Sequence, residues 1–165
     1  MALIAYLGLG SNVGDRAANL RAGLDGLAAR GVAVEAVSSA YETEPVGEVT
    51  DQPDFLNAAA RVRTELDPVA LLDACKAIEI ERGRELDAPR HSPRPLDVDL
   101  LLVGGLELRT ERLTLPHPEI ATRRFVLEPL LELDPGLEMP DGTRLADTLA
   151  SLPPGQRVTG AGALR

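Results

Sequence analysis

Two aspartates spaced two residues apart are the part of this sequence best suited to chemistry. Asp97 and Asp99 open an otherwise apolar run, D-V-D-L-L-L-V. If that run is a strand, both carboxylates lie on one face while Val98 and Leu100 point to the other. Like charges on one face repel each other, and a divalent cation relieves that repulsion. Oxygen ligands without cysteine favour Mg²⁺, so the pair predicts a magnesium site; the alternative is a solvated strand end.

A basic cluster lies just before this pair. Its members are Arg82, Arg84, Arg90 and Arg94. Arginine together with Mg²⁺ is suited to holding a polyphosphate and to neutralising charge as a phosphoryl group moves. Acidic residues are interspersed in the same segment, so an ordinary charged loop is the alternative. The neighbouring aspartates favour the phosphate site.

A second group of residues suits a planar ligand. On a predicted strand at Phe55–Glu65, Phe55 and Asn57 share one face, and the apolar Leu56, Ala58 and Val62 share the other. An aromatic ring beside an amide predicts a stacking platform with a hydrogen-bonding group. Phe125 is the candidate for the opposite wall. Each phenylalanine alone is equally at home in a core.

Several familiar site motifs are absent or incomplete. The chain has no G-x-x-x-x-G-K-[ST] and no G-x-S-x-G, and G-L-G-S-N at Gly8–Asn12 is not G-x-G-x-x-G. We expect Gly8–Asn12 to form a tight strand-to-helix turn with some backbone contact to ligand. Two histidines and the single cysteine, Cys75, give little support for a zinc hydrolase.

The elements that must position these residues follow a β-α-β-β-α-β order. Hydrophobic patterning predicts strands at Ala2–Leu9, Val32–Tyr41, Phe55–Glu65 and Leu96–Val103, and helices at Asp15–Arg30 and from Asp67 to about Arg82. This order predicts a ferredoxin-like α+β fold, with a mainly antiparallel sheet and helices on one face. Two long polar loops, Glu42–Asp54 and Arg84–Pro95, separate the elements.

Further elements are expected after the fourth strand. Gly104-Gly105 predicts a hairpin turn into Leu106–Thr110. A helix is expected near Glu119–Leu133, interrupted or kinked by Pro129, and a short one near Leu145–Leu152. We predict one domain over 1–159 and a flexible tail over 160–165.

Composition restricts the class of protein. Hydrophobic residues make up 44% of the 165 residues, enough for a packed core, and no apolar run is long enough to span a membrane. A net charge of −9 argues against a nucleic-acid partner. One cysteine excludes an internal disulfide, and a cytoplasmic location is the simplest expectation.

Taken together, these segments resemble the 6-hydroxymethyl-7,8-dihydropterin pyrophosphokinases, a family of folate biosynthesis. The matching segments, in the family's order, are GLGSN at 8–12, YETEPVG at 41–47, DQPDFLNAA at 51–59, IEIERGR at 78–84, PRPLDVDLLL at 93–102 and LTLPHPEIATRRFVLEPL at 113–130. They cover nearly the whole chain. As a set they are highly specific.

The resemblance implies a reaction and roles for named residues. ATP would give its terminal pyrophosphoryl group to the pterin alcohol, leaving AMP, with two Mg²⁺ held by Asp97 and Asp99. The pterin would sit between Phe55 and Phe125. Its polar edge would meet Thr43, Glu44, Val46 and Asn57. The catalytic arginines would be Arg84 and Arg94, and the nucleotide side would comprise Glu79, Arg84, Arg94, Leu100, Arg112, Thr114, His117 and Arg123. The two long loops would close over the substrates.

Two other classes of protein share this topology. A non-catalytic small-ligand-binding domain explains the fold but not an Asp pair beside an arginine-rich segment. An RNA-binding module needs aromatic-rich strands and a basic face, whereas this chain has two Phe, two Tyr, no Trp and a net charge of −9. We therefore expect a monomeric enzyme whose partners are ATP and a reduced pterin, with no nucleic acid and no membrane.

Overall fold

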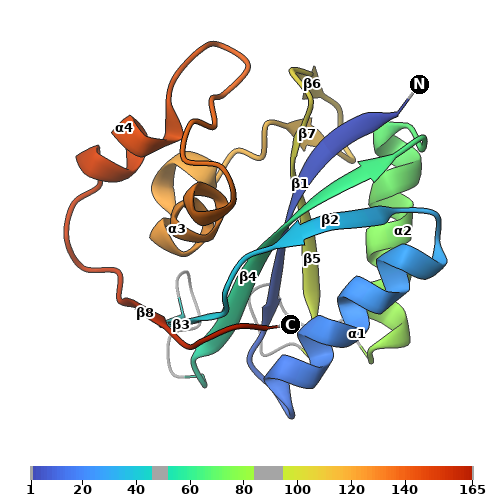
Figure 1. Ribbon diagram of the computed structural model, residues 1–165, viewed down its shortest axis with the longest axis horizontal. Coiled ribbons are helices and arrows are strands. Elements are labelled where there is room, and N and C mark those ends of the chain that lie inside the picture. Colours follow the sequence, from blue (N-terminus) through green and yellow to red (C-terminus); the bar gives the residue numbers. More distant parts are fainter. Residues whose placement is uncertain (1, 46–51, 84–94, 165) are drawn as a thin grey trace.

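A computed structural model describes residues 2–45, 52–83 and 95–164. Within these residues, one antiparallel sheet forms the centre of the molecule (Figure 1). Its strands are β1 (Leu3–Ser11), β2 (Ala33–Val37), β3 (Tyr41–Thr43), β4 (Phe55–Thr64), β5 (Asp97–Val103) and β8 (Val158–Gly160). The order is β5-β1-β4-β3-β8. Both β3 and β2 pair with β4: β3 pairs with its beginning (55–57) and β2 pairs further along it (60–63). This arrangement confirms the predicted ferredoxin-like α+β class.

The strand expected at Val32–Tyr41 is divided in two. Ser38–Ala40 separate β2 from β3. At the break the Ser38 N–H donates to the Ala59 carbonyl (2.8 Å), and the Ser38 hydroxyl accepts the Ala59 N–H (2.9 Å). The side chain thereby replaces one ladder bond. The chain is redirected, and β3 then lies beside the beginning of β4.

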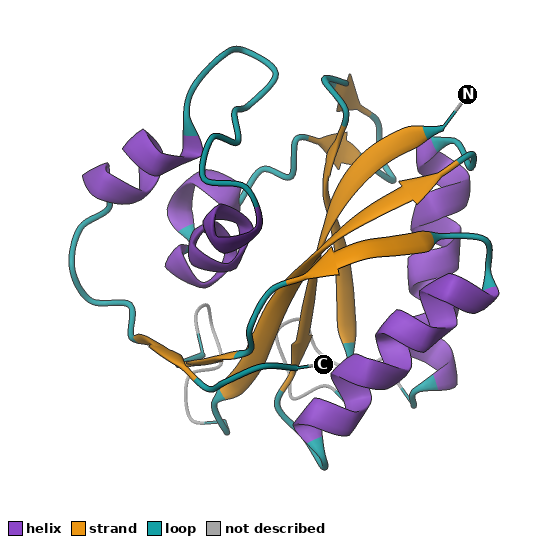
Figure 2. Cartoon of the chain, viewed as in Figure 1, coloured by secondary structure: helices purple, strands orange, loops and turns teal. Residues whose placement is uncertain are grey.

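Two helices cover one face of the sheet, as Figure 2 shows. They are α1 (Arg16–Ala29) and α2 (Pro68–Glu81), each opened by an aspartate whose side chain accepts a backbone N–H: Asp15 from Ala18 (3.1 Å) and Asp67 from Ala70 (2.8 Å). The buried residues that they contribute are Leu20, Leu24, Leu27, Leu71, Cys75 and Ile78, which pack against Leu7, Leu9, Ala58, Ala60 and Val62 of the sheet. Both helices agree with the predictions.

The opposite face of the sheet is also covered, which the predicted pattern did not include. The 3₁₀ helix η1 (Ile120–Thr122) and the helices α3 (Arg124–Leu133) and α4 (Leu145–Ser151) pack there. Their core residues Ile120, Leu127, Leu130 and Leu145 meet Tyr6, Ala59, Leu101 and Leu102. Because the central strands are apolar on both faces, one helical layer is not enough to bury them.

Local breaks in this second layer differ from the expectation. The predicted helix near Glu119–Leu133 is interrupted at Arg123, whose backbone is extended (φ −117°, ψ 107°). Pro129, expected to interrupt or kink it, lies inside α3.

The segment after β5 also departs from prediction. Gly104 has a positive φ of 50° and makes the expected turn. In the described part of the chain, however, β6 (Leu108–Arg109) pairs with β7 (Thr114–Leu115), not with β5. The expected hairpin with β5 is therefore wrong.

Residues 160–164, part of the tail expected to be flexible, make contacts with the rest of the chain in the structure. Gly160 ends β8 and pairs with Tyr41, the Ala161 N–H donates to the Ala40 carbonyl (2.8 Å), and Leu164 is buried. Backbone pairing does not depend on side chains, so a glycine-rich sequence can add a strand. The flexibility expected for 160–165 stays a prediction, and residue 165 lies outside the described residues. Within the described segments, no helix is long and apolar enough to cross a bilayer.

Candidate active site

Two glycines of β1 form the floor of a cavity on the α3 side of the sheet. Gly10 lies between Asn57 of β4 and Asp97 of β5, and Gly8 lies one row further along, opposite Asp99. A Cβ added to Gly10 would lie 2.5 Å from the Asn57 Oδ1. The missing side chains therefore keep a gap open between the acidic pair and the amide. The expected turn at Gly8–Asn12 is wrong, because β1 continues through Ser11.

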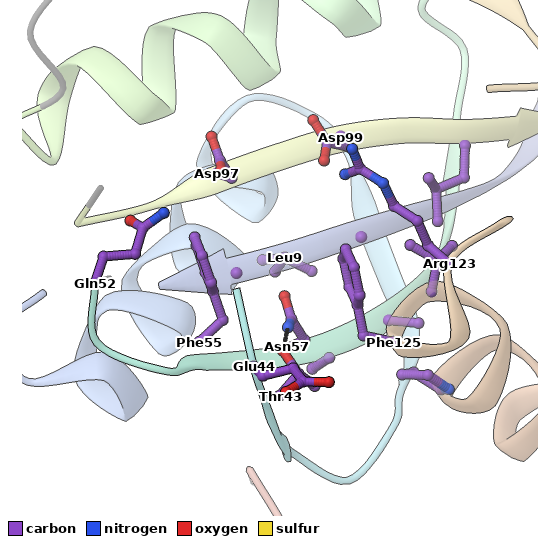
Figure 3. A pocket seen from close by; sticks show the side chains of 17 residues that line it. Leu9, Thr43, Glu44, Gln52, Phe55, Asn57, Asp97, Asp99, Arg123 and Phe125 are labelled. Atoms are coloured by element: carbon purple, nitrogen blue, oxygen red, sulfur yellow. Dashed lines mark hydrogen bonds between the residues drawn. The ribbon is translucent and has the colours of Figure 1, made fainter. Parts of the chain in front are cut away.

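Two aromatic rings form the walls of this cavity. Phe55 begins β4, and Phe125 lies in the first turn of α3. Figure 3 shows the rings on opposite sides of the cavity with Asn57 between them. The empty space between the walls, including the open mouth, is about 780 Å³. We call this space the aromatic slot.

The polar end of the slot is tied together by a buried hydrogen bond. Asn57 Nδ2 donates to Thr43 Oγ1 (2.6 Å), and both side chains are buried. The bond sets which way the amide points. Glu44, the next residue after Thr43, also lines the slot. The slot therefore presents hydrogen-bonding groups at one edge of two flat walls.

The chain before Phe55 is anchored by Asn12, which follows β1, and by Arg16 of α1. Asn12 Nδ2 donates to Gln52 Oε1 (2.8 Å) and to the Pro53 carbonyl (3.1 Å). Arg16 donates to the Asp54 carbonyl (3.1 Å) and forms an ion pair with Glu42. The Arg16 hydrogen bond lowers the pKa of Glu42 despite opposing desolvation. These contacts help to position the chain that enters β4 at Phe55.

The acidic pair lies as the alternation predicts. Asp97 and Asp99 both face the slot, whereas Val98 and Leu100 are buried with the core of the other face (Figure 3). Glu79 of α2, 1% exposed, accepts the Val98 N–H through Oε2 (2.8 Å). This buried carboxylate holds β5 at the peptide between the two aspartates.

The surroundings of Asp99 disfavour its ionised form. Desolvation by the surrounding protein, the Asp97 carboxylate and the Glu79 carboxylate raise the pKa of Asp99 to about 7, while Lys76 and Arg123 act in the opposite direction. Asp99 keeps exposed surface within the cavity, so water reduces the contribution of desolvation to this rise in pKa. The repulsion by the Asp97 and Glu79 carboxylates then remains as its main cause. A bound cation would instead favour the ionised form of Asp99 and lower its pKa.

A second cavity adjoins the slot at Asp99, which lines both. Its walls come from α2, β5 and the chain around β7: Leu72, Lys76, Val98, Leu100, Glu111, Arg112, Leu113, Thr114, His117 and Pro118. We call it the nucleotide-side cavity, after the role expected for its residues. Four predicted nucleotide residues, Leu100, Arg112, Thr114 and His117, meet here.

The His117 ring is held as a hydrogen-bond donor. Its Nδ1 accepts the Glu119 N–H (3.1 Å), and its backbone N–H donates to the Leu101 carbonyl (2.9 Å). Burial lowers the pKa of His117, with Arg123 and Lys76 adding to the effect and Glu119 opposing it. The neutral ring therefore carries its proton on Nε2.

Arg123 stands at the slot beside the acidic pair. Its guanidinium lies 5.4 Å from the centre of the Phe125 ring and forms an ion pair with Glu119. In Figure 3 it reaches toward Asp99. Stacking on Phe125 and pairing with Glu119 together hold the positively charged Arg123 side chain next to the carboxylates.

Three expected site residues are not among those that the structure describes, and one residue of the nucleotide-side cavity was not expected. Arg84, Arg94 and Val46 lie outside the described residues. Lys76, the only lysine of the chain, lines the nucleotide-side cavity and forms an ion pair with Glu79 (3.4 Å), yet no role was expected for it. Gly8 and Gly10 are spaced two residues apart, as are the two aspartates. This shared spacing could have indicated that the glycines lie opposite Asp99 and Asp97 on a neighbouring strand.

These features define a class of protein. An aromatic slot and a second cavity that share an acidic strand suit an enzyme that joins a planar substrate to a phosphorylated one. The profile of the 7,8-dihydro-6-hydroxymethylpterin-pyrophosphokinase (HPPK) family matches residues 6–135, and the chain belongs to this family. The predicted resemblance is thus confirmed.

Relatives from several bacteria carry the name 2-amino-4-hydroxy-6-hydroxymethyldihydropteridine pyrophosphokinase. The protein from Methylorubrum extorquens is 46% identical over 91% of this chain and 94% of its own length. That from Pseudomonas aeruginosa is 43% identical over 90% and 91%. That from Bacillus subtilis is 46% identical over 79% and 77%.

Solved structures agree on the fold. A Plasmodium falciparum HPPK-DHPS crystallised with pteroate superposes with a TM-score of 0.71 at 15% identity, covering 91% of this chain and 42% of that one. An HPPK-DHPS in complex with substrates gives 0.70 at 14% identity, covering 90% and 43%. The chain spans under half of those longer proteins. At these identities the likeness concerns the fold alone.

Proposed function

We propose that this chain transfers the terminal pyrophosphoryl group of ATP to the hydroxymethyl oxygen of 6-hydroxymethyl-7,8-dihydropterin. The products are AMP and the pterin diphosphate ester, in a step of folate biosynthesis. One observation carries the proposal: Asp99 lines the aromatic slot and the nucleotide-side cavity at once. A transfer between two substrates needs such a meeting point, which a simple ligand-binding domain does not.

The slot is assigned to the pterin. Phe55 and Phe125 would stack on its two faces, and Asn57 with the Thr43–Glu44 segment would bond its polar edge. Val46 belongs to this group by family resemblance. A flat heterocycle with donors and acceptors along one side matches two aromatic walls with an amide between them.

The nucleotide-side cavity is assigned to ATP. Leu100 would lie against the adenine, while Arg112, Thr114 and the His117 Nε2–H would bond ribose and phosphate oxygens. Arg123 would contact the phosphates near the slot, and Glu79 would keep β5 in place. Arg84 and Arg94 are assigned to the phosphates by family resemblance.

Asp97 and Asp99 suit Mg²⁺. The donors are hard oxygens, and a cation would offset both the desolvation and the carboxylate repulsion that raise the pKa of Asp99. Among the described residues no cluster of three or more His, Cys, Asp or Glu could enclose a metal. Two carboxylates plus triphosphate oxygens and water are a typical Mg²⁺ environment, and we propose two such ions. When bound, they neutralise the triphosphate and stabilise charge on the AMP oxygen.

The bond changes balance as follows. The alcohol oxygen bonds to the β-phosphorus while the bond from that phosphorus to the oxygen it shares with the α-phosphorus breaks. The electron pair leaves with AMP. The alcohol proton goes to solvent, oriented by Asp97, which lines the slot only. Positioning of the two substrates and charge neutralisation by the cations would together supply most of the rate enhancement.

AMP formation from ATP tests the proposal. The wild type should form AMP only with Mg²⁺ and the reduced pterin alcohol together. Asp99→Ala should lower turnover by at least ~10³-fold with the far-ultraviolet circular dichroism unchanged. Asp147→Asn, which changes an exposed carboxylate of α4, is the matched control and should keep full activity. Near-normal turnover by Asp99→Ala would refute the metal assignment.

Oligomeric state and location complete the proposal. We expect a cytoplasmic monomer whose partners are ATP and the pterin. Light scattering coupled to gel filtration should give a mass near the 17.5 kDa of one chain. A mass of twice that value would refute the monomer.

A further inference from the structure

Gln156, near the C-terminus, is bonded to the backbone on both sides of Arg123. Its Nε2 donates to the Thr122 carbonyl and its Oε1 accepts the Arg124 N–H, each at 2.8 Å. No side chain at the N-cap position itself caps α3. A residue 32 positions away along the chain therefore supplies the cap for the helix turn that carries Phe125.

Arg157, the next residue, is bonded to the opposite side of the slot. Its N–H donates to Glu44 Oε1 (2.9 Å), and its carbonyl accepts the Glu44 N–H (3.4 Å). Its guanidinium donates to Asp54 Oδ2 (2.5 Å), directly before Phe55. Two adjacent residues thus bond to the chain beside each wall of the slot.

We propose that Gln156 and Arg157 form a clamp that sets the spacing of the aromatic slot, making them positioning residues for the planar substrate. This inference rests on the proposed function of the slot. Phe55 and Phe125 are only half-buried and belong to different elements, so the sheet core does not fix their spacing by itself. Figure 1 shows the segment between α4 and β8 passing from the α3 layer to the edge of the sheet.

The spacing matters because stacking is short-ranged. Dispersion falls off steeply once rings separate beyond contact, and a gap of 0.5–1 Å already forfeits roughly a quarter to a half of the attraction. A clamp acting on the walls should therefore affect pterin affinity and leave the nucleotide-side cavity unchanged. A merely structural contact would instead lower stability without distinguishing between the substrates.

The first experiment compares Michaelis constants. Gln156→Ala should raise the KM for the pterin roughly tenfold, the scale of two lost hydrogen bonds, with kcat and the KM for ATP within about twofold. Gln156→Glu keeps the acceptor for the Arg124 N–H but places a carboxylate oxygen opposite the Thr122 carbonyl, so it should raise the pterin KM as well. Thr159→Ala, at an exposed position of β8, is the matched control and should leave all three constants unchanged.

A double-mutant cycle identifies the route of the effect. If Gln156 acts through Phe125, then Gln156→Ala in a Phe125→Ala background should change the pterin KM by less than about twofold. Equal fold-changes in both backgrounds, or an unchanged pterin KM in Gln156→Ala, would overturn the clamp. Should the alanine variant not fold, the Gln156→Glu variant supplies the same comparison.

The wild-type control separates the two proposals. If the wild type forms no AMP with the pterin, the proposed function fails. If it does, and Gln156→Ala behaves like the wild type, only the clamp fails.

Discussion

Adding one methyl group at Gly10 should damage both folding and pterin binding. In Gly10→Ala the new Cβ would lie 2.5 Å from the Asn57 Oδ1, closer than a carbon and an oxygen approach without a bond. The neighbouring position provides a control, because a Cβ at Gly8 would lie 3.4 Å from the flexible end of Leu101. The two substitutions are chemically identical and differ only in what they meet.

The expected magnitude follows from what Asn57 must give up. To relieve the overlap its amide has to move, and its 2.6 Å bond to Thr43 then breaks with both groups still buried. An unsatisfied buried polar group costs about 1–3 kcal/mol, and overpacking costs a similar amount. Because the movement of Asn57 that breaks the hydrogen bond also relieves part of the overpacking, the two costs do not add in full. We expect a loss of about 2–4 kcal/mol in the free energy of unfolding for Gly10→Ala and of less than about 1 kcal/mol for Gly8→Ala.

Urea denaturation and steady-state kinetics measure the two consequences. The pterin KM of Gly10→Ala should rise at least ~30-fold, because Asn57 is assigned to the pterin edge. In a variant that already carries Asn57→Ala, Gly10→Ala should cost less than about 1 kcal/mol, since the oxygen it met is gone. Wild-type stability and pterin KM in Gly10→Ala, or equal losses in both backgrounds, would refute this account of the glycine floor.

Two further predictions concern the nucleotide side and the entry to β4. His117→Ala should raise the KM for ATP about tenfold while leaving the KM for the pterin within about twofold; an equal rise in both would show that His117 does not belong to one cavity. Arg16→Gln removes the partner that lowers the pKa of Glu42. A carboxyl with a depressed folded-state pKa stabilises the fold above its ordinary value of 4.5, and that contribution is lost as pH falls through the folded-state pKa. The difference in urea midpoint between wild type and Arg16→Gln should therefore be constant near neutral pH and shrink below about pH 4.5; a constant difference at all pH values would contradict the assignment.

The sequence was most informative where a short period decides which way a side chain points. Alternation along a strand placed Asp97 and Asp99 on one face and Val98 on the other, and the structure agrees. The same rule put Phe55 and Asn57 together opposite the apolar face of β4. These inferences need only neighbouring residues, so they hold without knowledge of the fold.

It was least informative where a residue's role depends on distant partners. Glycine usually marks a turn, so Gly8 and Gly10 were interpreted as one, but cross-strand neighbours at Asn57 and Asp97 determine their role. Likewise, Gln156 caps a helix 32 residues earlier in the chain, and no local pattern reports such a contact. The helical layer on the second face was missed because it follows the β-α-β-β-α-β pattern instead of belonging to it.

The shared boundary at Asp99 has a consequence for how such a protein can change over time. Among the described lining residues, Asp99 alone belongs to both cavities. Of the other elements, α3, β3 and β4 line only the aromatic slot, and α2 and the chain around β7 line only the nucleotide-side cavity. Under the proposed function, substitutions that reshape one cavity can therefore accumulate without disturbing the other, except at Arg123, which lines the slot and is assigned to the phosphates of ATP. A compound that fills a single cavity is exposed to escape by such changes, whereas one that reaches across Asp99 contacts the position that the proposed function assigns to both substrates.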